Sequence, residues 1–314
     1  MMHITFIGGG NMATAIIAGL TKARGCQISV VEPNADKRAQ LAQQFGVTTQ
    51  EQLPVYFGSG QIVVLAVKPQ QLREVCGGLA SRLDGALVLS IAAGVGVSAL
   101  SRWLDGHERI VRIMPNTPAM IGKGVAGLYA PRGVDEQDRD AAQRIMAAAG
   151  STVWLDEESG IDDITAISGS GPAYVFYFIE GLIDAARQMG FDDATARELA
   201  LGTFEGAVAL ARHSGEDIAT LRANVTSKGG TTEQAIASFD ASALKTAILR
   251  GARACRAQGR RGHPATPQQC RCRQRMGRVL TNSNIRCTRK PGRKLLPGFF
   301  LSANSTFFAA KPAQ

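Results

Sequence analysis

The chain has 314 residues, 45% of them hydrophobic, and a formal net charge of +9. This length is enough for two domains with cores of their own, and because no run of about 18 apolar residues occurs, we expect no transmembrane helix. No basic segment with a cleavage site precedes the first predicted strand, so we expect a cytoplasmic protein.

The net positive charge comes from the C-terminal part of the chain. Residues 1–250 hold 21 basic and 26 acidic residues, which gives them a net charge of −5. Residues 251–314 hold 14 basic residues, no Asp or Glu, and four of the six cysteines. The body contains only Cys26 and Cys76, which indicates a reducing compartment and no disulfide framework.

The first predicted elements are a strand over 3–7, a glycine turn and a helix over 14–20. The turn reads GGGNMA from Gly8 to Ala13, and this strand–turn–helix context is typical of a dinucleotide-binding fingerprint. Gly8 suits the tight turn, Gly10 leaves room for a pyrophosphate, and the helix N-terminus offers N–H groups to it. The alternative is an ordinary βα turn that binds no ligand.

Further strands and helices alternate up to about residue 157. Strands are predicted over 27–31, 61–67, 86–91, 109–114, 125–130 and 152–155, and helices over 35–44, 70–82 and 135–149. This alternation predicts an α/β fold with a doubly wound, Rossmann-type sheet in residues 1–157.

Unusual residues follow five of these strands, at 8–10, 32, 68–69, 92–94 and 116–117. Ligands of open α/β sheets bind at the carboxyl ends of the strands, so we expect one cofactor crevice there. At any single end, Gly or Pro can simply terminate the strand. Glu32 lies 22 residues beyond Gly10, where an acidic residue commonly binds the adenosine ribose.

Residues 158–250 show no strand pattern. Helices are predicted over 172–189, 193–213, 216–224 and from 232, and Thr231 with Gln234 fits a capping box. The helix over 172–189 is apolar on most of its surface, so it lies inside a bundle or at a subunit interface. We therefore expect an all-helical dimerisation domain.

Five motifs of this chain resemble the pyrroline-5-carboxylate reductase family. They are FIGGGNM (6–12), AVKP (66–69), RIMPNTP (112–118), SGSGPAY (168–174) and VTSKGGTT (225–232). The resemblance covers residues 1 to about 250. It implies a homodimer or larger homo-oligomer that reduces L-1-pyrroline-5-carboxylate to L-proline with NAD(P)H. The resemblance favours NADPH. Glu32 favours NADH, and Asn34, Lys37 and Arg38 can offset it.

The resemblance also implies the site residues. The substrate is bound by Ser227, Gly229, Gly230, Thr231 and Thr232, and the catalytic residue is Thr232, whose hydroxyl bonds the substrate nitrogen. We expect Thr231 to cap the following helix. The cofactor-binding residues are Gly8, Gly10, Asn11, Met12, Glu32, Asn34, Ala66, Val67, Lys68, Pro69, Ala93, Asn116 and Thr117. No His, Cys or acid pair stands in these motifs, so we expect no metal.

After about Ile248 the family pattern stops. We expect residues 251–314 to be a disordered tail that arose by a frameshift; the functional alternative is a basic arm for nucleic acid. Two other functions stay open. One is a hydroxy-acid dehydrogenase, for which Lys228 is the only acid/base candidate in the helical motifs. The other is a cofactor-binding regulator that uses the tail, although we consider a nucleic-acid partner unlikely.

Overall fold

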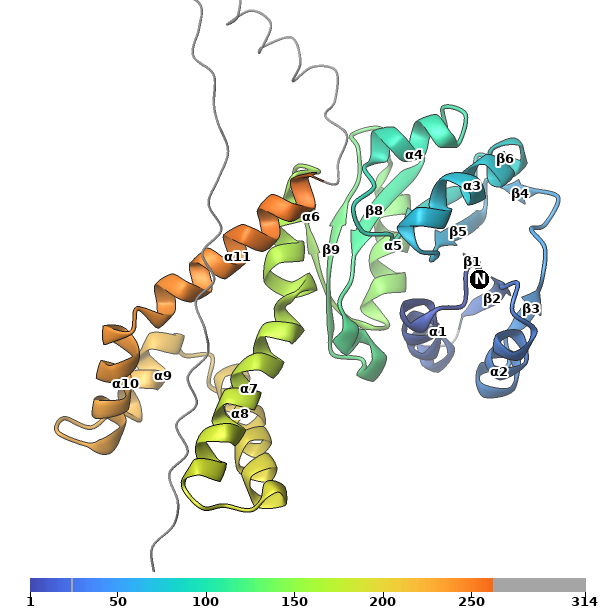
Figure 1. Ribbon diagram of the computed structural model, residues 1–314. Helices are drawn as coiled ribbons and strands as arrows, with labels where there is room; N and C mark the ends of the chain where they lie inside the picture. The colour runs from blue at the N-terminus through green and yellow to red at the C-terminus, as the bar shows by residue number, and fades with distance from the viewer. Residues whose placement is uncertain (24, 262–314) are drawn as a thin grey trace, which may run out of the picture. The chain divides into compact units, whose positions relative to one another are not determined.

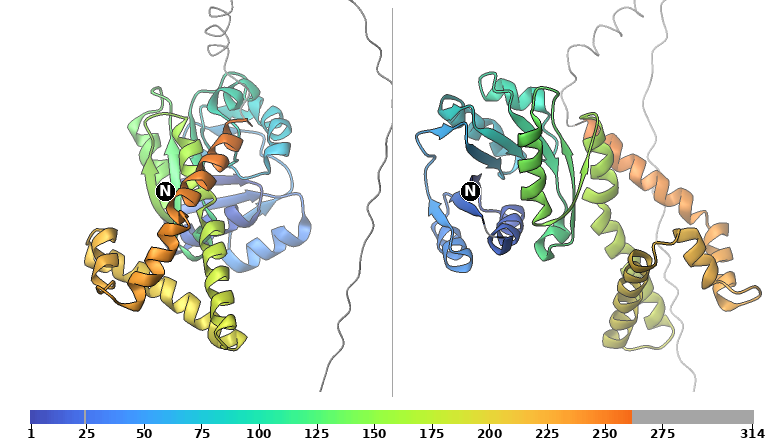
Figure 2. Two further views of the ribbon diagram at one scale, coloured as in Figure 1. Left: turned by 60° about the vertical axis from the view of Figure 1, so that its left-hand side comes forward. Right: turned by 180° about the vertical axis from the view of Figure 1, so that it is seen from behind.

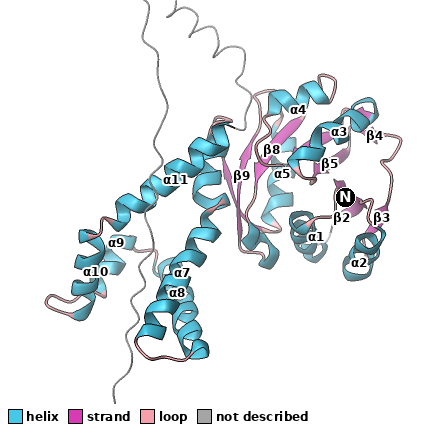
Figure 3. Ribbon diagram, viewed as in Figure 1, coloured by secondary structure: helices cyan, strands magenta, loops and turns pink. Residues whose placement is uncertain are grey.

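The computed structural model describes residues 1–23 and 25–261 (Figure 1). Strands occur only in its first part, up to Trp154, and the described chain beyond that residue contains helices and turns (Figure 3). The expected α/β class, a Rossmann-type domain followed by helices, is confirmed.

One eight-stranded sheet organises the first part, in the order β10-β9-β8-β7-β5-β1-β2-β3. Its strands are β1 (Met2–Ile7), β2 (Cys26–Val31), β3 (Thr48–Gln50), β5 (Gln61–Leu65), β7 (Leu87–Ser90), β8 (Ile110–Met114), β9 (Gly124–Tyr129) and β10 (Gly150–Trp154). The chain runs outward from β1 in one direction and from β5 in the other, so the strand order reverses between them. Open α/β sheets bind their ligands at such a reversal.

All neighbouring strands of this sheet are parallel except β8 and β9, which are antiparallel. Only a short 3-10 turn, η2 (Thr117–Ile121), joins these two strands. A parallel crossover needs a dozen or more residues, so the chain must turn back on itself here.

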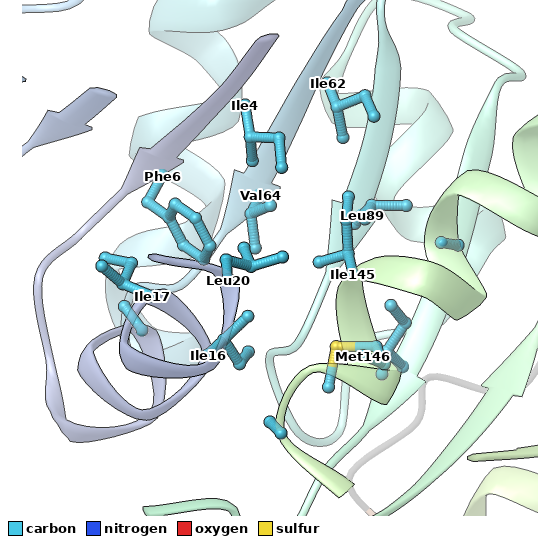
Figure 4. Packing of buried hydrophobic residues seen from close by; sticks show 14 of the residues in the cluster. Ile4, Phe6, Ile16, Ile17, Leu20, Ile62, Val64, Leu89, Ile145 and Met146 are labelled. Atoms are coloured by element: carbon cyan, nitrogen blue, oxygen red, sulfur yellow. The ribbon is translucent and has the colours of Figure 1, made fainter. Parts of the chain in front are cut away.

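Helices cover both faces of the sheet. They are α1 (Asn11–Ala23), α2 (Ala35–Phe45), α3 (Pro69–Leu79), α4 (Val97–Trp103) and α5 (Glu136–Ala147). Alternate residues of β1 point to opposite faces: Phe6 packs with Ile16 and Ile145 on one face (Figure 4), and Ile7 packs with Leu72 on the other. Burial on both faces explains the continuous apolar runs of the central strands.

The sequence analysis missed several short elements. These are β3, α4, the turn η1 (Ala80–Arg82) and the two-stranded pair of β4 (Phe57–Gly58) and β6 (Leu83–Asp84). Each is seven residues or shorter, too short for a hydrophobic period to stand out.

The second part begins with α6 (Gly160–Ile164) and a π-helical turn, η3 (Thr165–Gly169). The helices that follow are α7 (Gly171–Gln188), α8 (Asp193–Ser214), α9 (Ile218–Asn224), α10 (Thr231–Ala241) and α11 (Leu244–Arg261). α7 and α8 pack against each other and are seen side by side in the right-hand view of Figure 2. None of the described helices is long and apolar enough to span a membrane.

Helix α7 exposes a broad apolar face. It has no buried residue in the single chain, and Phe176 and Tyr177 are 60% and 73% exposed. The sequence left open whether this helix lies inside a bundle or at a subunit interface. Within this chain the helix is not enclosed, which favours the interface.

The predicted domain boundary at residue 250 was wrong. Helix α11 continues to Arg261, and its last turns pack on α6 and η3. Arg256 Nη2 donates to Asp163 Oδ2 at 2.9 Å, and Cys255 Sγ lies 3.2 Å from Ser170 Oγ. The Ala- and Arg-rich composition of these turns favours a helix, and Asp163 supplies the acidic partner that residues 251–261 lack. Residues 262–314 of the expected tail lie outside the described residues.

Ending the chain at Arg250 should therefore lower its Tm compared with a chain that ends at Arg261. The shorter chain loses the Arg256–Asp163 pair and the Cys255–Ser170 contact, which we expect to cost roughly 1–3 kcal/mol. Each kcal/mol corresponds to about 2–4 °C in a protein of this size. Differential scanning calorimetry of both chains measures the difference, and equal Tm values would contradict a structural role for these turns.

Candidate cofactor crevice and substrate loop

A cavity of about 620 Å³ opens at the carboxyl ends of β1, β2 and β5. Parallel strands end at the same edge of a sheet, so the loops that follow them converge there. Its lining comprises Ile7, Gly8, Gly10, Val31, Glu32, Pro33, Lys37, Glu51, Leu53, Ala66, Val67, Lys68, Gln71, Glu74, Val75 and Gly78. The expected crevice is thus present where the strand order reverses.

Two glycines of the first turn, Gly8 and Gly10, have different surroundings. Gly8 has a φ of +100°, and an added Cβ would lie 2.9 Å from the carbonyl oxygen of Ala66, so the protein itself requires glycine. An added Cβ at Gly10 would meet no atom within 4 Å. The space beside Gly10 therefore belongs to the cavity, at the start of α1. A dinucleotide pyrophosphate fits this arrangement.

Glu32 is buried, 8% exposed, and holds this turn in place. Its Oε2 accepts the N–H of Gly9 at 2.9 Å, and its Oε1 accepts the N–H of Asn34 at 3.0 Å. A carboxylate can accept about four hydrogen bonds, so two positions remain for the ribose hydroxyls. The residue expected to contact the cofactor therefore also shapes the loop that surrounds it.

The three residues expected to offset the charge of Glu32, which are Asn34, Lys37 and Arg38, have different roles in the structure. The Asn34 side chain caps α2 by accepting the N–H of Lys37 at 2.9 Å, and Arg38 donates to the carbonyl oxygens of Glu32 and Pro33 at 2.7 and 2.8 Å. Lys37 lines the cavity and forms no ion pair with any described residue. Its ammonium group is thus available to a ligand beside Glu32.

Only some of the remaining expected cofactor residues line the cavity. Ala66, Val67 and Lys68 line it, and Pro69 begins α3 just beyond it. Asn116 is buried: its Oδ1 accepts the N–H of Val125 at 2.8 Å, and its Nδ2 donates to the carbonyl oxygen of Ser168 at 3.0 Å. The lining does not include Asn11, Met12, Asn34, Pro69, Ala93, Asn116 or Thr117.

Sequence reasoning missed the contribution of α3 to the cavity. Gln71, Glu74, Val75 and Gly78 line it from this helix. Their spacing of three or four residues places them on one helix face, directly after the Lys68-Pro69 strand end. This helical spacing in the sequence could have indicated that the helix contributes to the cavity.

The predicted substrate loop, residues 225–232, contains a tight turn around its two glycines. Gly229 has a φ of +75°, and a Cβ on Gly230 would collide with Ser227 Oγ. The N–H of Gly230 donates to the Ser227 carbonyl at 3.0 Å, and the N–H of Gly229 donates to Glu233 Oε2 at 2.7 Å. The N–H groups of these two predicted substrate-binding residues are thus already bonded, one within the loop and one to the first turn of α10.

The expected capping box at Thr231 was wrong. The N-cap of α10 is Gly230, which has no side chain to offer, and Thr231 is the first helical residue. Glu233, rather than Gln234, reaches back to a backbone N–H. The two-glycine turn starts the helix one residue earlier than the sequence pattern indicated, so neither Thr231 nor Thr232 caps it.

The loop and the cavity do not meet within the described chain. Ser227, Thr231 and Thr232 are exposed, and no described residue beyond Gly78 lines the cavity. Helix α10, which follows the loop, packs on α11. A single chain therefore presents the two predicted halves of the site on separate surfaces.

Comparison with known proteins gives matches to both parts. The family model described as "Pyrroline-5-carboxylate reductase dimerisation" matches residues 158–261, and the one described as "NADP oxidoreductase coenzyme F420-dependent" matches residues 3–94. The pyrroline-5-carboxylate reductase of Haemophilus influenzae is 43% identical over 261 residues, which are 81% of this chain and 96% of that protein. That of Pseudomonas aeruginosa is 41% identical over 250 residues, 78% and 91% of the two chains.

Two solved structures are similar over almost their whole length. A pyrroline-5-carboxylate reductase from Coxiella burnetii has a TM-score of 0.79 and 38% identity, covering 83% of this chain and 98% of that one. A Plasmodium falciparum pyrroline carboxylate reductase with NADP bound has a TM-score of 0.72 and 26% identity, covering 84% and 98%.

Proposed function

The chain belongs to the pyrroline-5-carboxylate reductase family, and we propose that it reduces L-1-pyrroline-5-carboxylate to L-proline with NAD(P)H, the last step of proline synthesis. The observation that carries the proposal is 43% identity across 96% of a relative of that name, together with the glycine-lined cavity. Purified protein should oxidise NADPH or NADH, followed at 340 nm, when this imine is added. Cofactor binding without oxidation would contradict the proposal.

The crevice orients the cofactor rather than supplying acid or base groups. The turn at Gly8 and Gly10 and the start of α1 hold the pyrophosphate, and residues 66–68 line the far side of the cavity. When bound, a nicotinamide cofactor supplies the hydride for the carbon of the C=N bond. A protonated imine is already electrophilic, so the chain mainly has to align the two molecules.

The loop at 225–232 provides what the substrate needs. The first N–H groups of α10, at Thr231, Thr232 and Glu233, have no partner one turn earlier within the helix and suit a carboxylate. Ser227 and Thr232 are exposed beside them. In this proposal the Thr232 hydroxyl bonds the substrate nitrogen, and the bond between Gly229 and Glu233 keeps the loop in the required shape.

A second copy of the chain completes this arrangement. The family match assigns residues 158–261 to a dimerisation region, and α7 carries an uncovered apolar face. We propose that α7 packs on a second copy and that the loop of one subunit meets the crevice of the other. Free thiols at Cys26, Cys76 and Cys255 support a cytoplasmic location for this assembly.

We propose NADPH as the preferred cofactor, with Lys37 as the residue that contacts its 2′-phosphate. Replacing Lys37 with alanine should raise the KM for NADPH about 10–100-fold, because a charge-assisted hydrogen bond is lost, and should leave the KM for NADH unchanged. Lys123→Ala, at an exposed lysine after η2, is the control. Equal effects on both cofactors would remove Lys37 from this role.

A further inference from the structure

An ion pair between a buried arginine and a half-buried glutamate joins the two parts of the chain. Arg112, in the middle of β8, is 2% exposed, and its Nη1 donates to Glu158 Oε1 at 3.0 Å. Glu158 is the first residue of the region that matches the dimerisation family and stands just before Ser159, the N-cap of α6. Its own carbonyl oxygen accepts the N–H of Ile161, so the start of α6 is tied to the same residue.

The same carboxylate oxygen also binds the turn after β7. Glu158 Oε1 accepts the N–H of Val97 at 2.7 Å. Val97 is the first residue of α4, and the preceding Gly96 provides no side-chain cap. Residues 92–94, which include the predicted cofactor-binding residue Ala93, lie between β7 and this point. One residue, Glu158, thus connects β8, the turn before α4 and the first helix of the dimerisation region.

Glu158 is the counter-charge of Arg112 among the side chains that surround it. In the sheet, Arg112 stands opposite Ser90 of β7 and Tyr129 of β9. Ser90 is neutral, and burial, followed by the Glu158 charge, raises the pKa of Tyr129, which keeps the phenol neutral. An arginine this deeply buried needs an acidic partner, so the position of Glu158 is strongly determined.

We infer that Glu158, held by Arg112, is a positioning residue that sets the turn at 92–97 against the dimerisation region and thereby aligns the cofactor with the substrate. The inference rests on the proposed function. If the side chain at position 158 did not accept the N–H of Val97, the turn would be free to move relative to α6. Displacement of reacting groups by about 1 Å can cost about 100-fold in rate.

The test compares two double variants that both remove the ion pair. Arg112→Met with Glu158→Gln keeps an amide oxygen for the Val97 N–H, whereas Arg112→Met with Glu158→Met removes the acceptor. The inference predicts a kcat about 10–100-fold lower for the second variant than for the first, with similar Tm values and a KM for NADPH within about threefold. Equal kcat per folded enzyme in the two variants would overturn it.

A second measurement does not depend on the reaction. Hydrogen exchange followed by mass spectrometry should show faster exchange in peptides covering 91–100 for the Met/Met variant than for the Met/Gln variant. Glu157→Gln, at the neighbouring exposed glutamate that interacts with Ser159, should behave as the unmodified protein in both assays. If the unmodified protein does not reduce the imine, the proposed function fails, whereas equal exchange in the two variants overturns this inference.

Discussion

Gly10→Val should abolish NAD(P)H binding while leaving the fold intact. A Cβ at this position meets no protein atom within 4 Å, and Gly10 does not have a positive φ, so valine adds no clash or backbone strain to the free protein. Its methyl groups would occupy the cavity space at the start of α1 that we assign to the pyrophosphate. We expect the Kd to rise roughly 100-fold or more, about 2.7 kcal/mol of binding free energy.

Titration calorimetry with NADPH measures this effect, and a thermal unfolding curve reports the fold. Gly60→Val is the matched control. A Cβ at Gly60 would also meet no atom within 4 Å, but Gly60 does not line the cavity. Gly8→Val should behave differently from both variants and destabilise the free protein. The φ of Gly8 is +100°, which strains valine, and the added Cβ would contact the Ala66 carbonyl oxygen. Unchanged NADPH affinity in Gly10→Val would show that the cofactor does not approach this turn.

Thr232→Ala should lower kcat for imine reduction about 10²–10⁴-fold, the usual cost of removing one positioned proton donor. The imine nitrogen is separated from the substrate carboxylate by one ring carbon. A hydroxyl next to the N–H groups that bind the carboxylate can therefore reach that nitrogen. The affinity for NADPH should change little, because Thr232 does not line the cofactor cavity.

Thr231→Ala is the control for this prediction. Gly230 is the N-cap of α10 and no side chain caps the helix, so neither variant removes a cap, and both threonines are exposed. We expect Tm values close to that of the unmodified protein for both variants and a large loss of kcat for Thr232→Ala alone. A larger loss for Thr231→Ala would exchange the roles of the two residues. Normal turnover in both would place the substrate site outside this loop.

The sequence predicted those parts of the site that depend on a few neighbouring residues. The strand, Gly8–Gly10 turn and α1 lie where expected, and Glu32, Ala66, Val67 and Lys68 gather at one cavity. This succeeded because parallel strands end at a common edge whichever side chains they carry. The cap at Thr231 failed for the opposite reason: the exact start of a helix depends on backbone angles, here those of Gly230, which the sequence pattern does not define.

The predicted domain boundary at residue 250 was wrong because amino-acid composition does not show which residues come into contact after folding. The absence of acidic residues after Asp240 suggested a disordered tail from 251, yet Arg256 finds its acid in Asp163, 93 residues earlier. A charge pattern read along the chain cannot show a partner that only folding brings near.

By itself, the sequence determined the family, the order of strands and helices, and the glycine turns, because apolar periodicity and backbone freedom act over a few residues. Only the tertiary structure decided how polar groups are shared. In the folded chain both Glu32 carboxylate oxygens accept backbone N–H groups, and the Asn116 amide both accepts from and donates to the backbone. It also brought Arg112 to Glu158 across 46 residues. Burial requires each polar group to find a partner, and which partner it finds depends on the packing of the whole chain.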